Sequence, residues 1–322
     1  MITMNIDGRK PLLGELQGGT DGAWVYYSPL GKAVSEEIEK CFADYPQIQI
    51  CAKQLMPDHL HFVVWVKDSL PVSLGEMIRK LKIGCTHAYW EIALHMNVQS
   101  KDTTNSNARS KDTTSNRSSL FESGFHDRIM LHNGQLRNMI DYVHDNPRRL
   151  ALKRANPQLF RLHQRVPVAG FSCTTLGNQF LLDFPMKGVI QCSRRLIQEE
   201  IDHKKELCLE EAERGTVFVS AGISEGEKQI CRALREENYP LIILLKDGFP
   251  KETDPHYQYF KPQGVYFEAC AEGRLLLIEP NEELFADKDI EKQIYAKTGA
   301  LPHDTLRYHF LALNELARNI VN

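Results

Sequence analysis

The segment Met56-Pro57-Asp58-His59-Leu60-His61-Phe62-Val63-Val64-Trp65-Val66 decides how the first half of this chain folds. It places two imidazoles, one residue apart, at the head of an apolar run that predicts a β-strand over residues 59–67. Side chains of a strand alternate between its two faces. We therefore expect His59 and His61 on one face, close enough to share a metal ion. Four apolar side chains are expected on the opposite, core face: Leu60, Phe62, Val64 and Val66.

The surrounding sequence predicts a mixed domain. Helical spacing of apolar residues over 33–44, and again from about 135 to 142–146, flanks strand candidates at 47–55 and 59–67. A further helix is expected over 73–95, where Ser73 and Glu76 have the spacing of a capping box. Residues 98–119 are rich in Ser, Thr, Asn and Lys, which predicts a flexible insertion. We expect an α+β domain over residues 1–165, an antiparallel sheet with helices.

The second half has a different pattern. Short apolar runs at 188–192, 215–219, 240–245 and 273–278 alternate with helical stretches at about 195–213 and 225–237. Runs of this length, bounded by Gly or Pro, are typical of strands buried on both faces. Strand–helix alternation predicts a parallel, Rossmann-like α/β domain over residues 171–322.

The composition is that of a soluble protein of 322 residues, with 42% hydrophobic and 25% charged residues. No stretch has the roughly 18 to 20 apolar residues of a membrane helix, and the N-terminus lacks a basic and apolar secretory pattern. Eight scattered cysteines favour reduced thiols over a disulfide framework or a zinc site. We therefore expect a cytoplasmic protein without a membrane partner.

Charge is unevenly distributed. Residues 1–165 carry 21 Lys and Arg against 17 Asp and Glu, and the remainder carries 18 against 25. The basic excess gathers after residue 147. Such clusters are typical of contacts with a phosphate backbone, although a solvated helix face gives the same pattern. The candidate nucleic-acid-binding residues are Arg148, Arg149, Lys153 and Arg154.

The segment Asp141-Tyr142-Val143-His144-Asp145-Asn146-Pro147 offers a partner for the histidines. Tyr142 and Asn146 are four residues apart and share one helix face. They supply a phenol nucleophile and an amide oxygen that could complete a metal site. Because a residue before proline disfavours helical geometry, Asn146 is expected in the last turn of its helix.

These two segments, in this order and spacing, resemble the HUH single-tyrosine transposases. The similarity is greatest to the REP-associated tyrosine transposases, whose usual patterns are M-P-N-H-x-H and Y-I-x-x-N-P. It covers about residues 20–160 and includes the stretch Gly124-Phe125-His126-Asp127-Arg128. The family's usual Asn before the first histidine is Asp58 here.

The resemblance implies metal-dependent cleavage and rejoining of single-stranded or hairpin DNA. His59, His61 and Asn146 would hold Mg²⁺ or Mn²⁺ against the scissile phosphate. Tyr142 would attack phosphorus and form a 5′-phosphotyrosine link. Free tyrosine has a pKa of about 10, so the metal or a nearby cation must assist its deprotonation. His126, Asp127 and His144 are further candidates, either for a direct role or as hydrogen-bonded structural residues.

In the second half, residues 219–228 follow a strand and open a helix. Small residues at such a turn let backbone N–H groups approach a phosphate. This segment and residues 267–277 resemble the Rossmann-like domains related to DNA-processing protein A. The candidate phosphate or nucleotide site comprises Ser220, Gly222, Ser224 and Gly226. The alternative is an ordinary tight turn with Ser224 as the helix N-cap.

Two other functions remain open at this point. The chain could be a non-catalytic DNA-binding or regulatory protein whose second domain senses a nucleotide. It could also be a nucleotide-processing enzyme, for which Glu227 and Arg274 are the candidate carboxylate–arginine pair. A homodimer is a further partner that we consider.

Overall fold

The computed structural model describes residues 1–99, 118–249, 264–302 and 305–322. The predicted insertion at 98–119 lies almost wholly outside these residues. The chain divides into two compact units, Met1–Ala155 and Asn156–Asn322. We expected the first domain to extend to residue 165. The division falls earlier because β7 (His163–Val168) pairs with β8 (Phe171–Gly177) in the sheet of the second unit.

Unit 1 is built on a four-stranded antiparallel sheet with the order β4-β5-β1-β6. A separate β2–β3 hairpin lies beside it. Mixed α and β structure is therefore confirmed for this half of the chain. The strands are β1 (Ile2–Asn5), β2 (Gly14–Gly19), β3 (Gly22–Tyr27), β4 (Ile48–Leu55), β5 (His59–Val66) and β6 (His126–Asp127).

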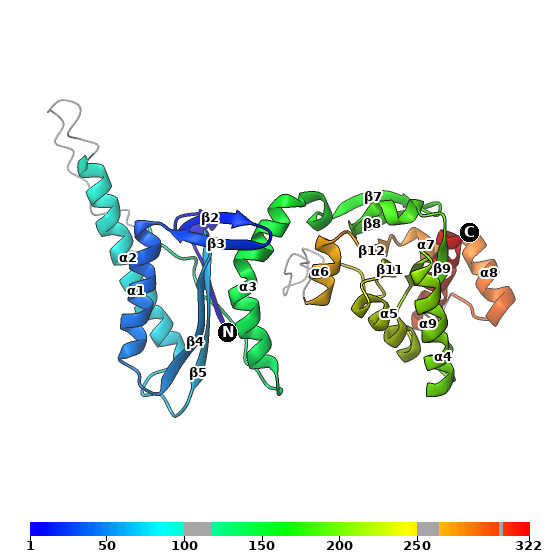
Figure 1. Cartoon of the computed structure of the whole chain (residues 1–322), viewed down its shortest axis with the longest axis horizontal. Coiled ribbons are helices and arrows are strands. Elements are labelled where there is room, and N and C mark those ends of the chain that lie inside the picture. Colours follow the sequence, from blue (N-terminus) through cyan, green and yellow to red (C-terminus); the bar gives the residue numbers. More distant parts are fainter. Residues whose placement is uncertain (100–117, 250–263, 303–304) are drawn as a thin grey trace. The chain divides into compact units, whose positions relative to one another are not determined.

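The two faces of this sheet are covered by different helices (Figure 1). On one face, Leu60 and Phe62 of β5 are fully buried against α1 (Pro29–Ala43) and α2 (Leu74–Gln99). On the other face, Val63 packs against Val143 of α3 (Gln135–Ala155). The predicted alternation of β5 is thus confirmed. Val66 is an exception, because it is about half exposed at the strand's end.

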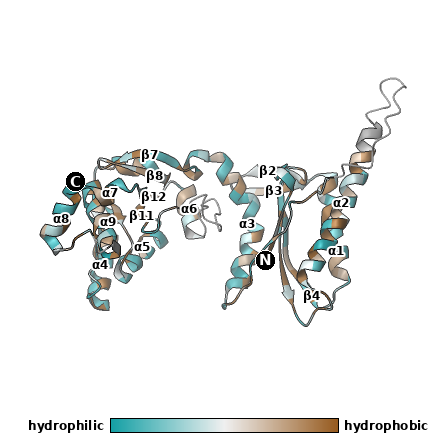
Figure 2. Cartoon of the chain, turned by 180° about the vertical axis from the view of Figure 1, so that it is seen from behind, coloured by the Kyte–Doolittle hydropathy of each residue, from teal (hydrophilic) through white to brown (hydrophobic). Residues whose placement is uncertain are grey.

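The helix termini follow local chemistry. Ser28 caps α1 by accepting a hydrogen bond from the Gly31 N–H at 3.0 Å. Ser73 and Glu76 form the predicted capping box at the start of α2, with bonds of 3.2 and 3.0 Å. In Figure 2 the helices carry hydrophilic and hydrophobic residues in alternating bands, as expected where one face lies on a sheet.

Helix α3 extends further than predicted. It passes through Pro147 and ends at Ala155 instead of ending near Asn146. Proline cannot donate a backbone hydrogen bond, so the carbonyl of Val143 loses its usual partner. The side-chain amide of Asn146 donates to that carbonyl at 3.4 Å. The helix therefore continues because a side chain replaces the missing backbone donor, an arrangement that the rule on pre-proline residues does not anticipate.

Unit 2 contains a six-stranded sheet with the order β7-β8-β12-β11-β10-β9, in which β9 to β12 are parallel and β7 and β8 antiparallel. The four apolar runs form the four parallel strands, as predicted. These are β9 (Lys187–Val189), β10 (Val217–Ser220), β11 (Leu241–Leu244) and β12 (Leu275–Pro280).

Helices cover both faces of the second sheet. One buried cluster joins the strands to α4 (Gln198–Glu213), α5 (Glu225–Glu236) and α6 (Val265–Ala271). The other joins them to α7 (Glu283–Ala286), α8 (Lys288–Thr298) and α9 (Thr305–Val321), helices that the sequence pattern did not predict. Short 3₁₀ helices lie at Asp7–Arg9, Pro157–Phe160 and Gln179–Asp183.

The order of the parallel strands does not confirm the Rossmann-like subtype of the prediction. From β9 to β12, each strand lies beside the one that precedes it in the chain, so the order never reverses among the described parallel strands. Doubly wound folds bind their ligand where the strand order does reverse. The second unit is thus an α/β domain with a mixed sheet, and the described parallel strands of that sheet lack this switch point. Among the described residues, no helix is both long and apolar enough to cross a membrane.

Candidate active site on the first sheet

The two histidines of β5 lie together, as predicted. Their ring centroids are 4.8 Å apart and their planes meet at 82°. The His61 ring is 6.0 Å from that of Tyr142, which α3 carries across the same face of the sheet. His61 is 7% exposed, so it lies under the helix, and His59 is partly exposed beside it. The strand and the helix therefore bring the predicted ligand pair and nucleophile to one place.

Both imidazoles are oriented by neighbouring side chains. His59 Nδ1 lies 2.6 Å from Asp58 Oδ1, and His61 Nδ1 lies 2.7 Å from Thr3 Oγ1. In the tautomer in which Nδ1 donates to these oxygens, the lone pair of each ring is on Nε2. Metal-ligating histidines are typically held in this way by a second hydrogen bond. The geometry therefore suits two Nε2 ligands.

Asp58 is itself held by Arg9, whose Nε lies 3.1 Å from Asp58 Oδ2. Arg9 also donates to Asn5 Oδ1 at 2.5 Å. Burial opposes ionisation of Asp58, but the hydrogen bond from His59 and the charges of His59 and Arg9 outweigh it and lower the pKa of this carboxyl. Asp58 is thus a charged acceptor for His59, a role that the sequence analysis did not assign to it.

Tyr142, Asn146 and Arg149 lie on one face of α3, spaced by four and three residues. The Arg149 guanidinium carbon is 5.4 Å from the centre of the Tyr142 ring, and its NH1 is 4.0 Å from Asp145 Oδ2. Arg149 is 8% exposed. We predicted it as one of four nucleic-acid-binding residues, with a solvated helix face as the alternative. The structure instead packs it against the candidate nucleophile, because the helix continues through Pro147 and keeps Arg149 in register with Tyr142.

The other basic residues of this stretch differ from Arg149. Arg148 makes a two-pronged ion pair with Asp145, at 2.6 and 3.2 Å. Lys153 is half-buried and Arg154 is exposed near the end of α3. Arg148 is thus partly neutralised within the helix. Arg154 is the most accessible of the four for contact with an anion.

The predicted third metal ligand is Asn146, which is 8% exposed. Its Nδ2 faces the Val143 carbonyl, which leaves Oδ1 as the amide atom for a ligand. Two imidazoles and one amide oxygen suit Mn²⁺ better than Mg²⁺, because Mg²⁺ prefers oxygen ligands alone. Among the described residues, no three His, Cys, Asp or Glu side chains are grouped so that they could hold a metal. A metal here would therefore need the amide or a substrate oxygen.

The remaining candidate residues of the first unit are exposed and lie outside the cluster of His59, His61 and Tyr142. His126 on β6 and His61 on β5 both pair with Thr3 on the strand between them, β1, so the three residues form one row across the sheet. His126 is exposed. Asp127 follows it on the next position and is exposed as well. His144 lies on the exposed side of α3. Of these three, His126 is placed best for contact with a substrate at the histidine pair.

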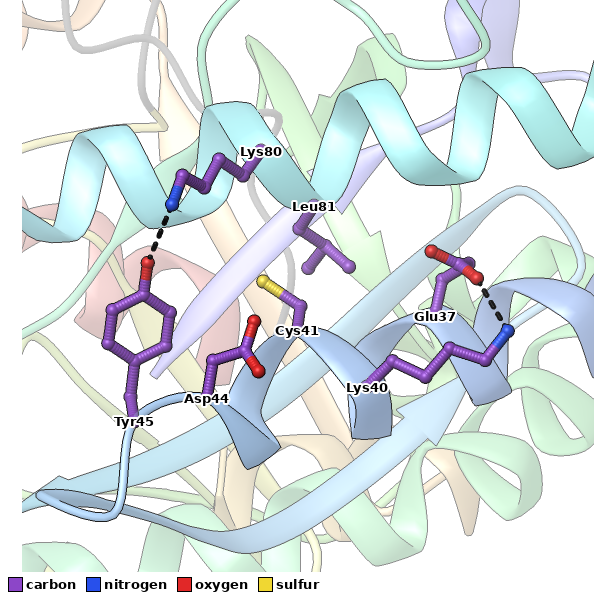
Figure 3. A pocket seen from close by; sticks show the side chains of 7 residues that line it. All are labelled: Glu37, Lys40, Cys41, Asp44, Tyr45, Lys80 and Leu81. Atoms are coloured by element: carbon purple, nitrogen blue, oxygen red, sulfur yellow. Dashed lines mark hydrogen bonds and ion pairs between the residues drawn. The ribbon is translucent and has the colours of Figure 1, made fainter.

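A shallow pocket of about 220 Å³ lies on the opposite side of the sheet, between α1 and α2 (Figure 3). Its cations are paired within the pocket. Lys40 binds Glu37 at 2.8 Å and Lys80 donates to the Tyr45 hydroxyl at 3.2 Å. We assign no chemistry to it.

In the second unit, the candidate phosphate turn after β10 is occupied by a carboxylate of the chain itself. Glu227 Oε2 accepts from the N–H groups of Ile223 and Ser224 at 2.6 and 3.3 Å, and Oε1 accepts from Cys192 N–H at 3.1 Å. Ser224 is the N-cap of α5, as the alternative interpretation expected. A phosphate here would compete with Glu227 for the same donors.

The other residues of this turn have structural contacts. Ser220 is fully buried and accepts from the Gly222 N–H at 3.1 Å. Gly222 has a φ of 58°, which favours glycine, and a side chain at Gly226 would meet Cys192 Cβ at 3.1 Å. The nucleotide site stays a prediction, and a thermal-shift series with nucleotides tests it.

Glu227 and Arg274 do not form the catalytic pair that we considered. Glu227 follows the carboxyl end of β10, whereas Arg274 precedes the amino end of β12. These strands are parallel members of one sheet, so the two side chains belong to opposite edges. Arg274 forms an ion pair with Glu272 instead.

Comparisons with known proteins give little further information. No family model matches the chain, and no curated protein matches it either. A solved structure of DNA processing protein A from Helicobacter pylori, described for its single-stranded DNA binding mode, is similar at 24% identity. The match covers 37% of this chain and 54% of that chain, with a TM-score of 0.27. The chain thus spans about half of that structure's length, and a similarity this weak supports no argument here.

Proposed function

We propose that the first unit cleaves and rejoins single-stranded or hairpin DNA through a covalent bond to Tyr142. The observation that supports this most is the meeting of the His59–His61 pair with Tyr142 across one sheet face, 6.0 Å ring to ring from His61. Scissile-phosphate chemistry needs a positioned nucleophile and positive charge. Tyr142 supplies the first and Arg149 part of the second. This is also the activity that the resemblance to HUH single-tyrosine transposases implies.

The proposed reaction is a balanced exchange of phosphoester bonds. The Tyr142 oxygen forms a bond to phosphorus as the bond from phosphorus to the 3′ oxygen breaks. The phenol proton leaves, and the departing 3′ oxygen takes up a proton as a free hydroxyl. Arg149, whose guanidinium carbon is 5.4 Å from the centre of the Tyr142 ring, would neutralise charge on the phosphate oxygens. A divalent ion bound by His59, His61 and Asn146 would polarise the same phosphate.

The histidines' neighbours prepare this site. Asp58 and Thr3 fix the rings so that they need not reorient when a metal binds. Because the phosphoester energy is retained in the tyrosine link, the reverse attack by another 3′ hydroxyl rejoins DNA without ATP.

The test uses one oligonucleotide labelled at either end. With Mn²⁺, the protein should retain the 3′-labelled fragment through denaturing electrophoresis, whereas the 5′-labelled fragment should leave with a free 3′ hydroxyl. Tyr142→Phe and His59→Ala should abolish the adduct, and Tyr295→Phe, a change at an exposed tyrosine of the second unit, should not. An undiminished adduct with Tyr142→Phe would show that the nucleophile is assigned wrongly.

The competing function is non-catalytic DNA binding. Oligonucleotide binding without an adduct under Mg²⁺ or Mn²⁺ would favour it over the proposal.

Light scattering of the same protein tests whether the chain is a homodimer.

A further inference from the structure

We propose that Trp24 and Tyr26 on the β2–β3 hairpin form a platform on which bases of the single-stranded DNA stack. This inference rests on the proposed function. It assigns the surface that holds the single-stranded DNA away from the reaction centre. The two side chains are two residues apart on β3 and therefore share one face of the hairpin. They are 54% and 58% exposed. A single exposed aromatic is ordinary, but two adjacent ones on one strand face are not.

The hairpin has one buried and one solvent-facing side. Val25, between the two aromatics, is 8% exposed and points to the other face. An antiparallel pair of this kind usually carries polar residues on its solvent face. Here that face carries two large rings, with Glu15 and Gln17 opposite them on β2. Positions two residues apart on a strand are about 7 Å from each other along the backbone, so each ring can take its own base.

The Trp24 ring is seated on the hairpin backbone. Gly18 has a φ of 81°, and a Cβ at this position would lie 2.1 Å from the Gly22 carbonyl oxygen and 2.8 Å from Trp24 Cζ3. The indole therefore lies close to the backbone of Gly18, where the carbonyl and the ring together exclude a side chain. Lys32 lies 5.9 Å from the centre of the Tyr26 ring. The first ring is thus pre-positioned and the second has a cation next to it, the combination used by proteins that bind single strands without sequence preference.

The hairpin is joined to the candidate active site. The Leu13 N–H, at its base, donates to the Pro57 carbonyl at 2.9 Å, two residues before His59. Its strands also contact α3, beside which they lie in Figure 1. A strand held on the platform therefore stays next to the helix that carries Tyr142 and the basic residues beyond it.

Charge favours a nucleic acid over a protein as the occupant. Lys32 borders the platform. Helix α3, which the hairpin contacts, ends in Lys153 and Arg154. Glu15 and Gln17 interrupt the apolar surface, whereas the buried centre of a protein interface is depleted of charge. Because Glu15 is acidic, stacking and the neighbouring cations must supply the attraction.

The test measures binding in the Tyr142→Phe background, so that no covalent adduct contributes. Trp24→Ala and Tyr26→Ala should each weaken the affinity for a mixed-sequence single-stranded oligonucleotide about 10-fold at fixed salt, by fluorescence anisotropy. Trp24→Phe should retain most of the affinity. The matched control is Trp65→Ala, which removes an equally exposed ring, at 52%, from the far end of β5 and should leave the affinity unchanged.

Equal affinity of the alanine variants and the parent, with unchanged melting temperatures, would overturn the platform. So would a change from dimer to monomer without loss of DNA binding, which would make this face a protein interface. Adduct formation is measured separately with Tyr142 present. Ring-dependent binding without an adduct would retain the platform and reject the proposed function, and an adduct with ring-independent binding would do the reverse.

Discussion

At the residue scale, the histidine pair is held by groups from different parts of the chain. Asp58 is the neighbour of His59 in sequence, whereas Thr3 reaches His61 through the pairing of β1 with β5. Asp58 fixes the orientation of the ring that it holds, and Arg9 keeps the carboxylate in place. Ligand orientation is therefore set before a metal arrives.

Asp58→Ala should weaken Mn²⁺ binding by about 10- to 100-fold, because His59 loses the acceptor that fixes its ring. Isothermal titration calorimetry provides the measurement. Asp58→Asn is the matched variant, since an amide oxygen can still accept from Nδ1, and its loss should be smaller. Equal affinities of wild type and Asp58→Ala would show that this contact does not orient a ligand.

Arg149→Ala should lower the rate of adduct formation about 100-fold while leaving Mn²⁺ affinity unchanged, because the guanidinium acts on the phosphate and not on the metal. Single-turnover kinetics with labelled oligonucleotide measure the rate. Arg137→Ala, which removes an exposed arginine of the same helix, should have no such effect. A similar loss in both variants would indicate a general effect of charge.

The sequence predicted the residues of the site better than their partners. Strand alternation was sufficient to place His59 and His61 together, and helical spacing placed Asn146 with Tyr142. Thr3 could not be predicted, because the register of β1 against β5 is fixed by contacts distant in sequence. The same limit applies to Arg149, whose position depends on whether α3 continues beyond Pro147.

At the scale of the element, α3 contains the main departure from the predicted structure. A proline in a helix interior costs about 3 kcal/mol, yet Pro147 lies within a helix of 21 residues. The Asn146 side chain donates to the Val143 carbonyl, to which Pro147 cannot donate. This contact fixes the direction of the Asn146 amide. The helix thereby turns Asn146 Oδ1 away from its own backbone.

Pro147→Ala should stabilise the first unit by about 1–2 kcal/mol, because a backbone donor returns and little buried volume is lost. The same change should slow adduct formation, since the Val143 carbonyl no longer holds the Asn146 amide. Urea unfolding and adduct kinetics measure the two effects. Pro71→Ala, at an exposed loop position, should change neither. A stabilised variant with full activity would show that the contact between Asn146 and Val143 does not orient the amide for the reaction.

At the scale of the whole molecule, the strands of the second unit were predicted from the sequence, whereas their order and some of its helices were not. The four parallel strands of unit 2 match the four apolar runs, because burial on both faces leaves a clear pattern. Their order was not predictable, since a crossover to either side of a strand uses similar local sequence. The helices α8 and α9, which cover one face of this sheet, were not recognised as elements.

Buried thiols should make stability fall at alkaline pH. Burial raises the pKa of Cys85 and of Cys173, each to about 12, from 9.0. The unfolded chain then releases these protons first, so the stabilising effect is complete below pH 9 and declines as pH rises toward 12. Melting temperatures between pH 8 and 11 should fall, and less steeply for Cys85→Ala. A slope identical to that of wild type would contradict the assignment.

The central claim is that Tyr142 becomes covalently linked to the 5′ end of cleaved DNA. Its most direct test is protease digestion of the Mn²⁺-dependent adduct, followed by mass spectrometry of the nucleotide-bearing peptide. The account predicts a phosphonucleotide on the peptide that contains Tyr142, and no such peptide when EDTA is present. A modified peptide from any other part of the chain, or a cleaved oligonucleotide with no modified peptide, would contradict it.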